Sequence, residues 1–427
     1  MNSTKEKLWE KGIKRFIKII SIQIGVFLLF LELGSFIASK NGLLLYNLTP
    51  KIYWDPSCLE DYEEDTKGFL GKYFGYSEKD PWGVWHVPDR TIRQSKLSFD
   101  IKKTFNEIGA RDQSFQEIPA ESLLLLGDSF AEGWGVRYEN TSQFILEQLM
   151  GRDVLNMGCS YCFGPLQQLM LYQNFKYLPH SGVIVYILPG NDFIDNDSRF
   201  FNQPPDSPNT NADYRHYYRY RPYFGSSENP LEPFYFPQAV KRYALTEAQA
   251  QAQVKVKPST FYSTFREFIL HNFWSGNTFR TLFEVLFYGD LEYLDPEASL
   301  TNISYYNDNQ EQQRNLVLAH KEIVKVSEKR DVLFVIIPWQ EDIRQYKLRD
   351  LPDSYKQSLW YRRLKDLTAT NGRKISVLDL IEHLPEDTDR LFFSNDPHWN
   401  PHGNRWAAKA IYQHIKENGL FTPKESK

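Results

Sequence analysis

Residues 122–135 read SLLLLGDSFAEGWG and decide the fold. Four consecutive leucines run into Gly127, Asp128 and Ser129, and a short apolar run that ends at a turn is typical of a buried strand in a parallel sheet. Ligands of open α/β sheets bind just outside the carboxyl ends of such strands. Ser129 is therefore the first candidate for chemistry. In a second reading, Asp128 and Ser129 only cap the following helix.

Apolar runs and amphipathic stretches alternate after this point. The alternation predicts an α/β fold with three layers, in which a five-stranded parallel sheet lies between helices. The common doubly wound, flavodoxin-like order 2-1-3-4-5 would make the first and third strands neighbours. The expected strands are 122–126, 153–156, 182–188, 332–337 and 375–380, and the expected helices are 141–150, 166–177, 311–329, 355–371 and 401–418.

Two segments do not follow the alternation. Residues 39–120 have no clear period and are expected to form an irregular lead-in packed on the main domain, which spans 121–427. Residues 193–305 form a large aromatic-rich insertion, including a tyrosine–arginine run at 214–223 and an aromatic helical stretch at 261–287. The run suits a surface packed on its own domain, or the binding of anions or sugar rings. The helical stretch suits a lid or a position at the membrane surface.

The N-terminus predicts the compartment. Residues 1–18 are predominantly basic, and 19–38 are apolar apart from Gln23, Glu32 and a few small residues. This length is near the ~20 residues that cross a bilayer as a helix. The basic flank predicts a cytoplasmic tail at 1–18. The apolar core exceeds the roughly 7–15 residues of a cleaved signal peptide, which favours an uncleaved anchor with the main domain periplasmic or extracellular.

Composition and cysteine usage narrow the function. A net charge of −4 gives no reason to expect a nucleic-acid partner, and 41% hydrophobic residues suit a globular core. Cys159 and Cys162 form a Cys-x-x-Cys pair that an exported domain can hold as a small disulfide. Neither zinc spacing nor a thioredoxin-like context accompanies the pair. We therefore expect no metal and no redox role.

A serine nucleophile needs a base, and the base needs a third group to hold its tautomer. His398 precedes the last expected helix, and Asp396 lies two residues before it. In a bent loop this spacing brings the carboxylate beside the imidazole. His402 is a competing base, although it lies at the start of the helix. Each residue also has a plain structural reading, as a capping or packing group.

Two further residues follow neighbouring strands. Gly158 ends the second strand and Asn191 follows the third, so that both would flank the crevice beside Ser129. A developing oxyanion needs preorganised donors. The backbone N–H groups of Ser129 and Gly158 and the amide of Asn191 are the expected three.

Together these residues resemble the SGNH (GDSL-like) hydrolase family. Its four marks occur in order as Gly127-Asp128-Ser129, Gly158, Gly190-Asn191-Asp192, and Asp396 with His398. EGWGV, VLNMGCS, GNDFIDN and the earlier FNEIGARD resemble its membrane-anchored bacterial branch. The commoner family pattern has an aspartate three residues before the histidine, where this chain has Asn395. Asp-x-His-Trp is similar to a variant in SGNH-like acetyltransferases of exopolysaccharide systems.

The resemblance implies a membrane-anchored serine esterase that cleaves O-acetyl or short-chain acyl esters through an acyl-enzyme. Ser129 would be the nucleophile, His398 the base and Asp396 its orienting group. No cofactor is required. One alternative keeps this triad and transfers the acyl group to a cell-envelope glycan; the other is a binding or assembly protein with a degenerate site. The expected partners are an acylated glycan or lipid, and the bilayer through residues 19–38.

Overall fold

A computed structural model provides the structure. Its contacts divide the chain into two compact units, residues 1–54 with 258–291 and residues 55–257 with 292–427. Each unit is described by itself. The structure describes residues 2–40, 76–96, 98–160, 163–201, 221–235, 273, 275, 278, 279, 282, 305, 307, 309–349, 353–367, 373–393 and 396–422.

The first unit contains the N-terminal helix α1 (Asn2–Lys40). Its segment Phe16–Ala38 has a mean hydropathy of 2.1 and is long enough to cross a membrane. Near the end of this segment, the Glu32 carboxylate accepts a hydrogen bond of 2.9 Å from the backbone N–H of Ser275. One turn further, the hydroxyls of Ser35 and Thr278 lie 2.6 Å apart. The one acidic group of the apolar segment is thus partnered by a distant part of the chain.

The second unit is built on the predicted five-stranded parallel sheet. Its strands are β5 (Leu123–Gly127), β6 (Val154–Gly158), β7 (Gly182–Ile187), β8 (Asp331–Ile336) and β9 (Ile375–Asp379). The order β6-β5-β7-β8-β9 is the predicted 2-1-3-4-5 order, and every neighbouring pair is parallel. Gly127 pairs with Gly158, so the ends of β5 and β6 lie side by side.

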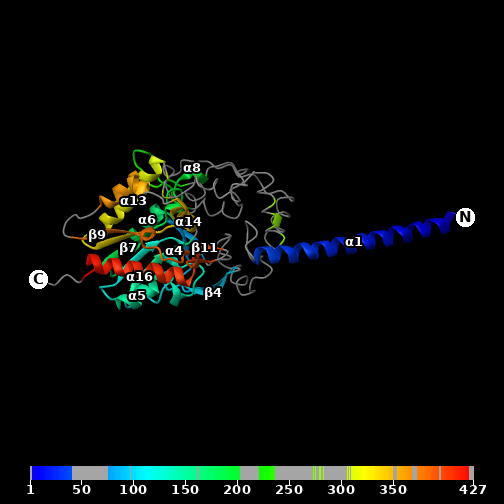
Figure 1. The fold of residues 1–427 in the computed structure, drawn as a ribbon, viewed down its shortest axis with the longest axis horizontal. Coiled ribbons are helices and arrows are strands. Elements are labelled where there is room, and N and C mark those ends of the chain that lie inside the picture. The colour runs from blue at the N-terminus through cyan, green and yellow to red at the C-terminus, as the bar shows by residue number, and fades with distance from the viewer. Residues whose placement is uncertain are drawn as a thin grey trace. The chain divides into compact units, whose positions relative to one another are not determined.

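Helices cover both faces of this sheet (Figure 1). One face packs on α6 (Pro165–Phe175), α13 (Gln310–Val326) and α15 (Leu359–Lys365). The other packs on α5 (Ser142–Met150) and α16 (Pro401–Asn418). Alternate strand residues serve opposite faces: Leu124 and Leu126 belong to the first core cluster, Leu123 and Leu125 to the second. Shorter helices are α4 (Ser129–Glu132), α7 (Pro189–Asp192), α8 (Ser198–Phe201) and α14 (Gln340–Arg349).

The lead-in differs from the sequence prediction. Its described part forms two antiparallel hairpins, β1 (Tyr76–Asp80) with β2 (Gly83–His86) and β3 (Thr91–Lys96) with β4 (Phe99–Thr104). The prediction of irregular structure is therefore wrong for these strands. Alternating burial in β4 follows its sequence FDIKKT, yet Lys103 occupies a buried position there. A lysine at a buried position breaks the apolar–polar alternation by which a strand is recognised in sequence. Lys103 can be buried there because it pairs with Glu132.

The end of the chain adds a third hairpin, β10 (Phe392–Phe393) with β11 (Asp396–Trp399). The helix predicted at 355–371 is shorter in the structure. A 3₁₀ turn occupies Asp353–Gln357, Ser358 is the N-cap residue, and α15 starts at Leu359. Within the insertion, a bridge joins Tyr223 to Phe234. The tyrosine–arginine run up to residue 220, most of the stretch 261–287, Cys162 and Asn395 lie outside the described residues.

Candidate active site

Ser129 lies where β5 ends and α4 begins. Asp128 caps α4 by accepting a 2.9 Å hydrogen bond from the backbone N–H of Phe130. The capping reading is thus right for Asp128. The Ser129 hydroxyl, by contrast, lies 2.7 Å from His398 Nε2. Within this turn, Asp128 caps the helix, and the hydroxyl of Ser129 contacts the imidazole of His398.

Asp396 and His398 come from the single strand β11. Side chains two residues apart in a strand point to the same side, which places the carboxylate beside the ring. Asp396 Oδ1 lies 2.5 Å from His398 Nδ1 and also accepts the backbone N–H of His398 at 3.0 Å. With Nδ1 held by a carboxylate, Nε2 is the nitrogen that can accept the proton of Ser129.

The three groups differ in burial in a way that suits proton transfer. The side chain of Asp396 is fully buried, whereas 20% of the His398 side chain is exposed. Ser129 is 9% exposed. The orienting carboxylate is thus removed from water while the base and the hydroxyl remain reachable. His402 lies in the first turn of α16, where its backbone N–H donates to the capping side chain of Asn400.

Asn191 and Gly158, the other predicted donors, lie at the ends of the neighbouring strands. The Asn191 amide Nδ2 lies 3.4 Å from Asp128 Oδ2, a long contact that leaves its second hydrogen for another acceptor. The backbone N–H of Gly158 already donates to Asn156 Oδ1 at 2.9 Å. Ser129 is the first residue of α4, so its own backbone N–H has no partner within the helix.

Part of the chain matches a known family. Residues 303–426 match the family described as "SGNH hydrolase-like domain, acetyltransferase AlgX". The chain carries an SGNH hydrolase-like domain. The matched residues include Asp396 and His398, and Ser129 lies before them. Among curated proteins, no relative matches the chain.

Three solved structures are similar to the chain at low identity. A lipase, Lip_vut3, from a goat rumen metagenome has 11% identity and a TM-score of 0.34, covering 69% of this chain and 96% of its own. A Clostridium thermocellum family 3 carbohydrate esterase has 10% identity and a TM-score of 0.31, with 70% and 96% covered. An acetyl xylan esterase, Est2A, from the rumen bacterium Butyrivibrio proteoclasticus has 10% identity and a TM-score of 0.31, with 76% and 68% covered.

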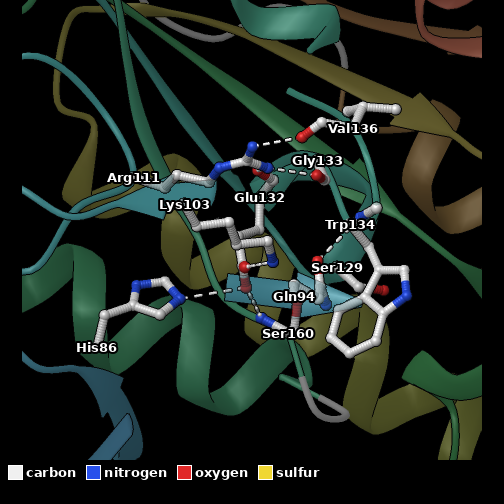
Figure 2. A network of polar contacts seen from close by, with 12 residues as sticks. His86, Gln94, Lys103, Arg111, Ser129, Glu132, Gly133, Trp134, Val136 and Ser160 are labelled. Carbon is white, nitrogen blue, oxygen red and sulfur yellow. Dashed lines mark hydrogen bonds and ion pairs between the residues drawn. The ribbon is translucent and has the colours of Figure 1, made fainter. Parts of the chain in front are cut away.

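Sequence reasoning missed a buried ionic cluster beside the Ser129 turn. Figure 2 shows His86, Lys103 and Ser160 converging on the carboxylate of Glu132, the last residue of α4. Lys103 Nζ pairs with Oε1, while the Ser160 backbone N–H and His86 Nε2 reach Oε2 at 2.5 and 3.1 Å. Although burial alone would raise it, Lys103 and His86 hold the pKa of Glu132 well below its usual range. Burial lowers the pKa of Lys103 to about 8, against the opposing charge of Glu132.

Arg111, from the FNEIGARD segment, holds the loop after α4. Its buried guanidinium donates to the carbonyls of Glu132 (2.8 Å), Gly133 and Val136 (2.5 Å), as Figure 2 shows for the last two. Gly133 has a φ of +83°, a left-handed conformation that glycine adopts without strain. FNEIGARD therefore supports the loop that follows Ser129 and α4. Its residue types alone carried no such signal.

Of the cysteine pair, the structure describes Cys159 alone, because Cys162 lies outside the described residues. Cys159 is buried, and burial raises the pKa of its thiol well above the usual range. Within the described ranges, the one group of three potential metal ligands is His86, Glu132 and Cys159, whose ligand atoms lie within 4.8 Å of one another. Lys103 already pairs with Glu132 there. The protein thus supplies its own cation at the place where a metal would bind.

Proposed function

We propose that this protein is a membrane-anchored O-acyltransferase that moves a short acyl group, such as acetyl, onto a hydroxyl of a cell-envelope glycan through an acyl-enzyme on Ser129. One observation carries the proposal. Ser129 Oγ, His398 and Asp396 form a continuous hydrogen-bonded series with distances of 2.7 and 2.5 Å. That series is the arrangement that activates a serine for attack on an ester carbonyl.

In the first half-reaction, Ser129 Oγ attacks the acyl carbonyl and His398 Nε2 takes its proton. Asp396 stabilises the resulting imidazolium across the Nδ1 contact. Asn191 and the backbone N–H of Ser129 donate to the oxyanion. The tetrahedral species then collapses, the bond to the donor alcohol breaks, and His398 returns the proton to that alcohol. The acyl group remains on Ser129 as an ester.

In the second half-reaction, a glycan hydroxyl replaces the donor alcohol. His398 takes its proton as its oxygen bonds to the acyl carbon, and the bond to Ser129 Oγ then breaks. His398 finally reprotonates Ser129. If water enters instead of a sugar hydroxyl, the same steps give hydrolysis, which is the esterase reading. The match of residues 303–426 to a family described as acetyltransferase supports transfer over hydrolysis.

Residues 19–38 supply the membrane part of the proposal. They lie within the apolar segment Phe16–Ala38 of α1, and basic residues precede them. The positive-inside rule then places the N-terminus in the cytoplasm and the catalytic domain outside. An enzyme held there meets glycans of the cell envelope directly.

The test compares wild type, Ser129→Ala and the control Ser376→Ala in detergent, with p-nitrophenyl acetate as donor and a neutral oligosaccharide as acceptor. Ser376 bonds to His414 on α16 and lies outside the triad. We expect acetylated oligosaccharide from wild type and Ser376→Ala, and none from Ser129→Ala. Release of free acetate alone would replace transfer with hydrolysis. Equal activity in all three proteins, or failure of a fluorophosphonate to label Ser129, would overturn the serine mechanism.

A further inference from the structure

Trp134 contacts the acid–base pair of the site in two ways. Its indole N–H donates a 3.2 Å hydrogen bond to Asp396 Oδ2. Its ring stacks on His398, with centroids 5.4 Å apart and planes inclined by 30°. Trp134 is 8% exposed and lies two residues after the end of α4. A single side chain therefore touches both the carboxylate and the base that Ser129 needs.

The spacing of Asp396 and His398 explains why such a contact matters. Asp396 Oδ1 serves both the backbone N–H and the Nδ1 of His398, which leaves Oδ2 on the far side of the carboxylate. The terminal torsion of an aspartate side chain is broad and is not fixed by rotamer preference. A donor on Oδ2 fixes that torsion. Trp134 supplies such a donor, and hydrogen bonds to an ionised acceptor are among the strong ones.

Trp134 is itself held firmly by the buried surroundings shown in Figure 2. Its backbone N–H donates to the Ser129 carbonyl at 2.9 Å. The following N–H, that of Gly135, donates to Gln94 Oε1 at 3.1 Å. The ammonium of Lys103 lies 4.9 Å from the centroid of the indole ring. Since Lys103 is paired with Glu132, the cluster behind the nucleophile also fixes the ring that faces His398.

We propose that Trp134 is a positioning residue for the acid–base pair, holding the Asp396 carboxylate and the His398 ring in the orientation that accepts the proton of Ser129. The proposal rests on the acyl-transfer mechanism above and adds a residue to it. In this proposal Trp134 sets the rate of proton transfer and does not contribute to substrate binding. Loss of the indole N–H therefore lowers kcat and leaves KM nearly unchanged.

The principal variant is Trp134→Phe, which keeps an aromatic ring against His398 and removes the N–H. Trp360→Phe is the matched control, because Trp360 is also a buried tryptophan whose indole N–H is bonded, in its case to the carbonyl of Tyr305 at 3.3 Å. Trp360 belongs to a different core cluster from Trp134. Both changes remove one hydrogen bond and similar volume from a packed interior. Only the first touches the acid–base pair.

We expect kcat of Trp134→Phe to fall about tenfold or more, since a hydrogen bond to a charged group is worth about 1.5–3 kcal/mol, with KM within about twofold of wild type. Trp360→Phe should keep the wild-type kcat. A second readout does not depend on turnover: in protein with ¹⁵N-labelled histidine, the proton on His398 Nδ1 should change its chemical shift in Trp134→Phe and keep it in Trp360→Phe.

Two results would overturn the proposal. One is a folded Trp134→Phe protein with the wild-type kcat and His398 proton signal; the other is an equal loss of kcat in Trp360→Phe. If Trp134→Phe does not fold, Trp134→Tyr takes its place under the same criteria. Failure of the underlying mechanism gives a different result, because Ser129→Ala would then retain the wild-type rate. The His398 proton signal would still change in Trp134→Phe.

Discussion

The backbone N–H of Gly158 donates to the side-chain oxygen of Asn156, two residues earlier in β6, at 2.9 Å. Gly158 is nevertheless required at its position, because a Cβ there would lie 2.3 Å from the backbone nitrogen of Glu132 in α4. The glycine thus allows β6 and the nucleophile helix to approach closely. Because its N–H already donates to Asn156, we propose that oxyanion stabilisation rests mainly on the Ser129 N–H and Asn191.

Asn191→Ala tests this division of roles. We expect kcat to fall about 10²–10³-fold, the usual cost of one oxyanion donor, with little change in KM, because the lost contact forms only as charge develops. The measurement is steady-state kinetics with p-nitrophenyl acetate. Asn418→Ala, which changes an exposed asparagine at the end of α16, should retain the wild-type rate. An undiminished kcat in Asn191→Ala would remove Asn191 from the site.

Gly158→Ala should act through packing. The added methyl group must displace the α4 backbone near Glu132, and overpacking of this kind costs typically 1–3 kcal/mol. Because α4 carries Ser129, we expect activity to fall together with the unfolding midpoint in urea. Gly151→Ala is the comparison: no atom lies within 4 Å of a Cβ there, although its φ of +63° adds local strain. A fully active, fully stable Gly158→Ala protein would contradict the close approach.

The sheet could be predicted from sequence because its signals are local. Each strand is a short apolar run, and each run is followed by a turn or an amphipathic helix, so the alternation of residues 122–191 and 310–418 indicates a parallel sheet. The predicted strand order rests on the common doubly wound arrangement. The placing of Ser129 beside Asn191 follows from the same logic, since the residues at the carboxyl ends of parallel strands meet at one edge. The D-x-H spacing also suffices to place Asp396 beside its histidine.

Other parts of the site depend on tertiary partners that no local pattern reveals. Lys103 is buried in a strand, although a lysine predicts an exposed position. Only its pairing with Glu132 explains the burial. Trp134 looks like an ordinary core aromatic until Asp396, 262 residues later, is placed against its N–H. The two hairpins of residues 76–104 were missed for a related reason, because polar residues such as Gln94 and Lys103 take buried positions in their strands.

The anchor can be tested without any enzymatic assay. We expect the full-length protein to stay with membranes through an alkaline carbonate wash, and mass spectrometry of the mature protein to recover peptides from residues 1–18. Both results follow from an apolar segment, Phe16–Ala38, that exceeds the core of a cleaved signal peptide. A mature N-terminus after residue 38, with the protein released by the wash, would show cleavage.

Glu147 on α5 links stability to pH. Its carboxylate accepts hydrogen bonds from Gln143 Nε2 at 2.8 Å and from the backbone N–H of Val154 at 3.0 Å. Burial, together with the charge of Asp112, raises the pKa of Glu147 to about 8. In the unfolded chain a glutamate titrates near pH 4.3, roughly its unperturbed value. Between these values the folded state binds the extra proton, so the contribution of Glu147 to stability is present below about pH 4.3 and is lost as pH rises through 8.

Glu147→Gln separates this effect from the other titrating groups. Burial also raises the pKa of Asp112 to about 6 and lowers that of His320 to about 4, so the whole protein responds in both directions. The glutamine keeps both acceptor contacts and cannot ionise. Relative to wild type, we therefore expect the variant to gain about 1–2 kcal/mol in the free energy of unfolding between pH 5 and pH 8, a figure reduced for partial exposure.

Urea unfolding at the two pH values measures the gain, and Glu328→Gln, at an exposed position, should show none. An equal pH response in wild type and Glu147→Gln would mean that Glu147 is already ionised in the folded protein at pH 5.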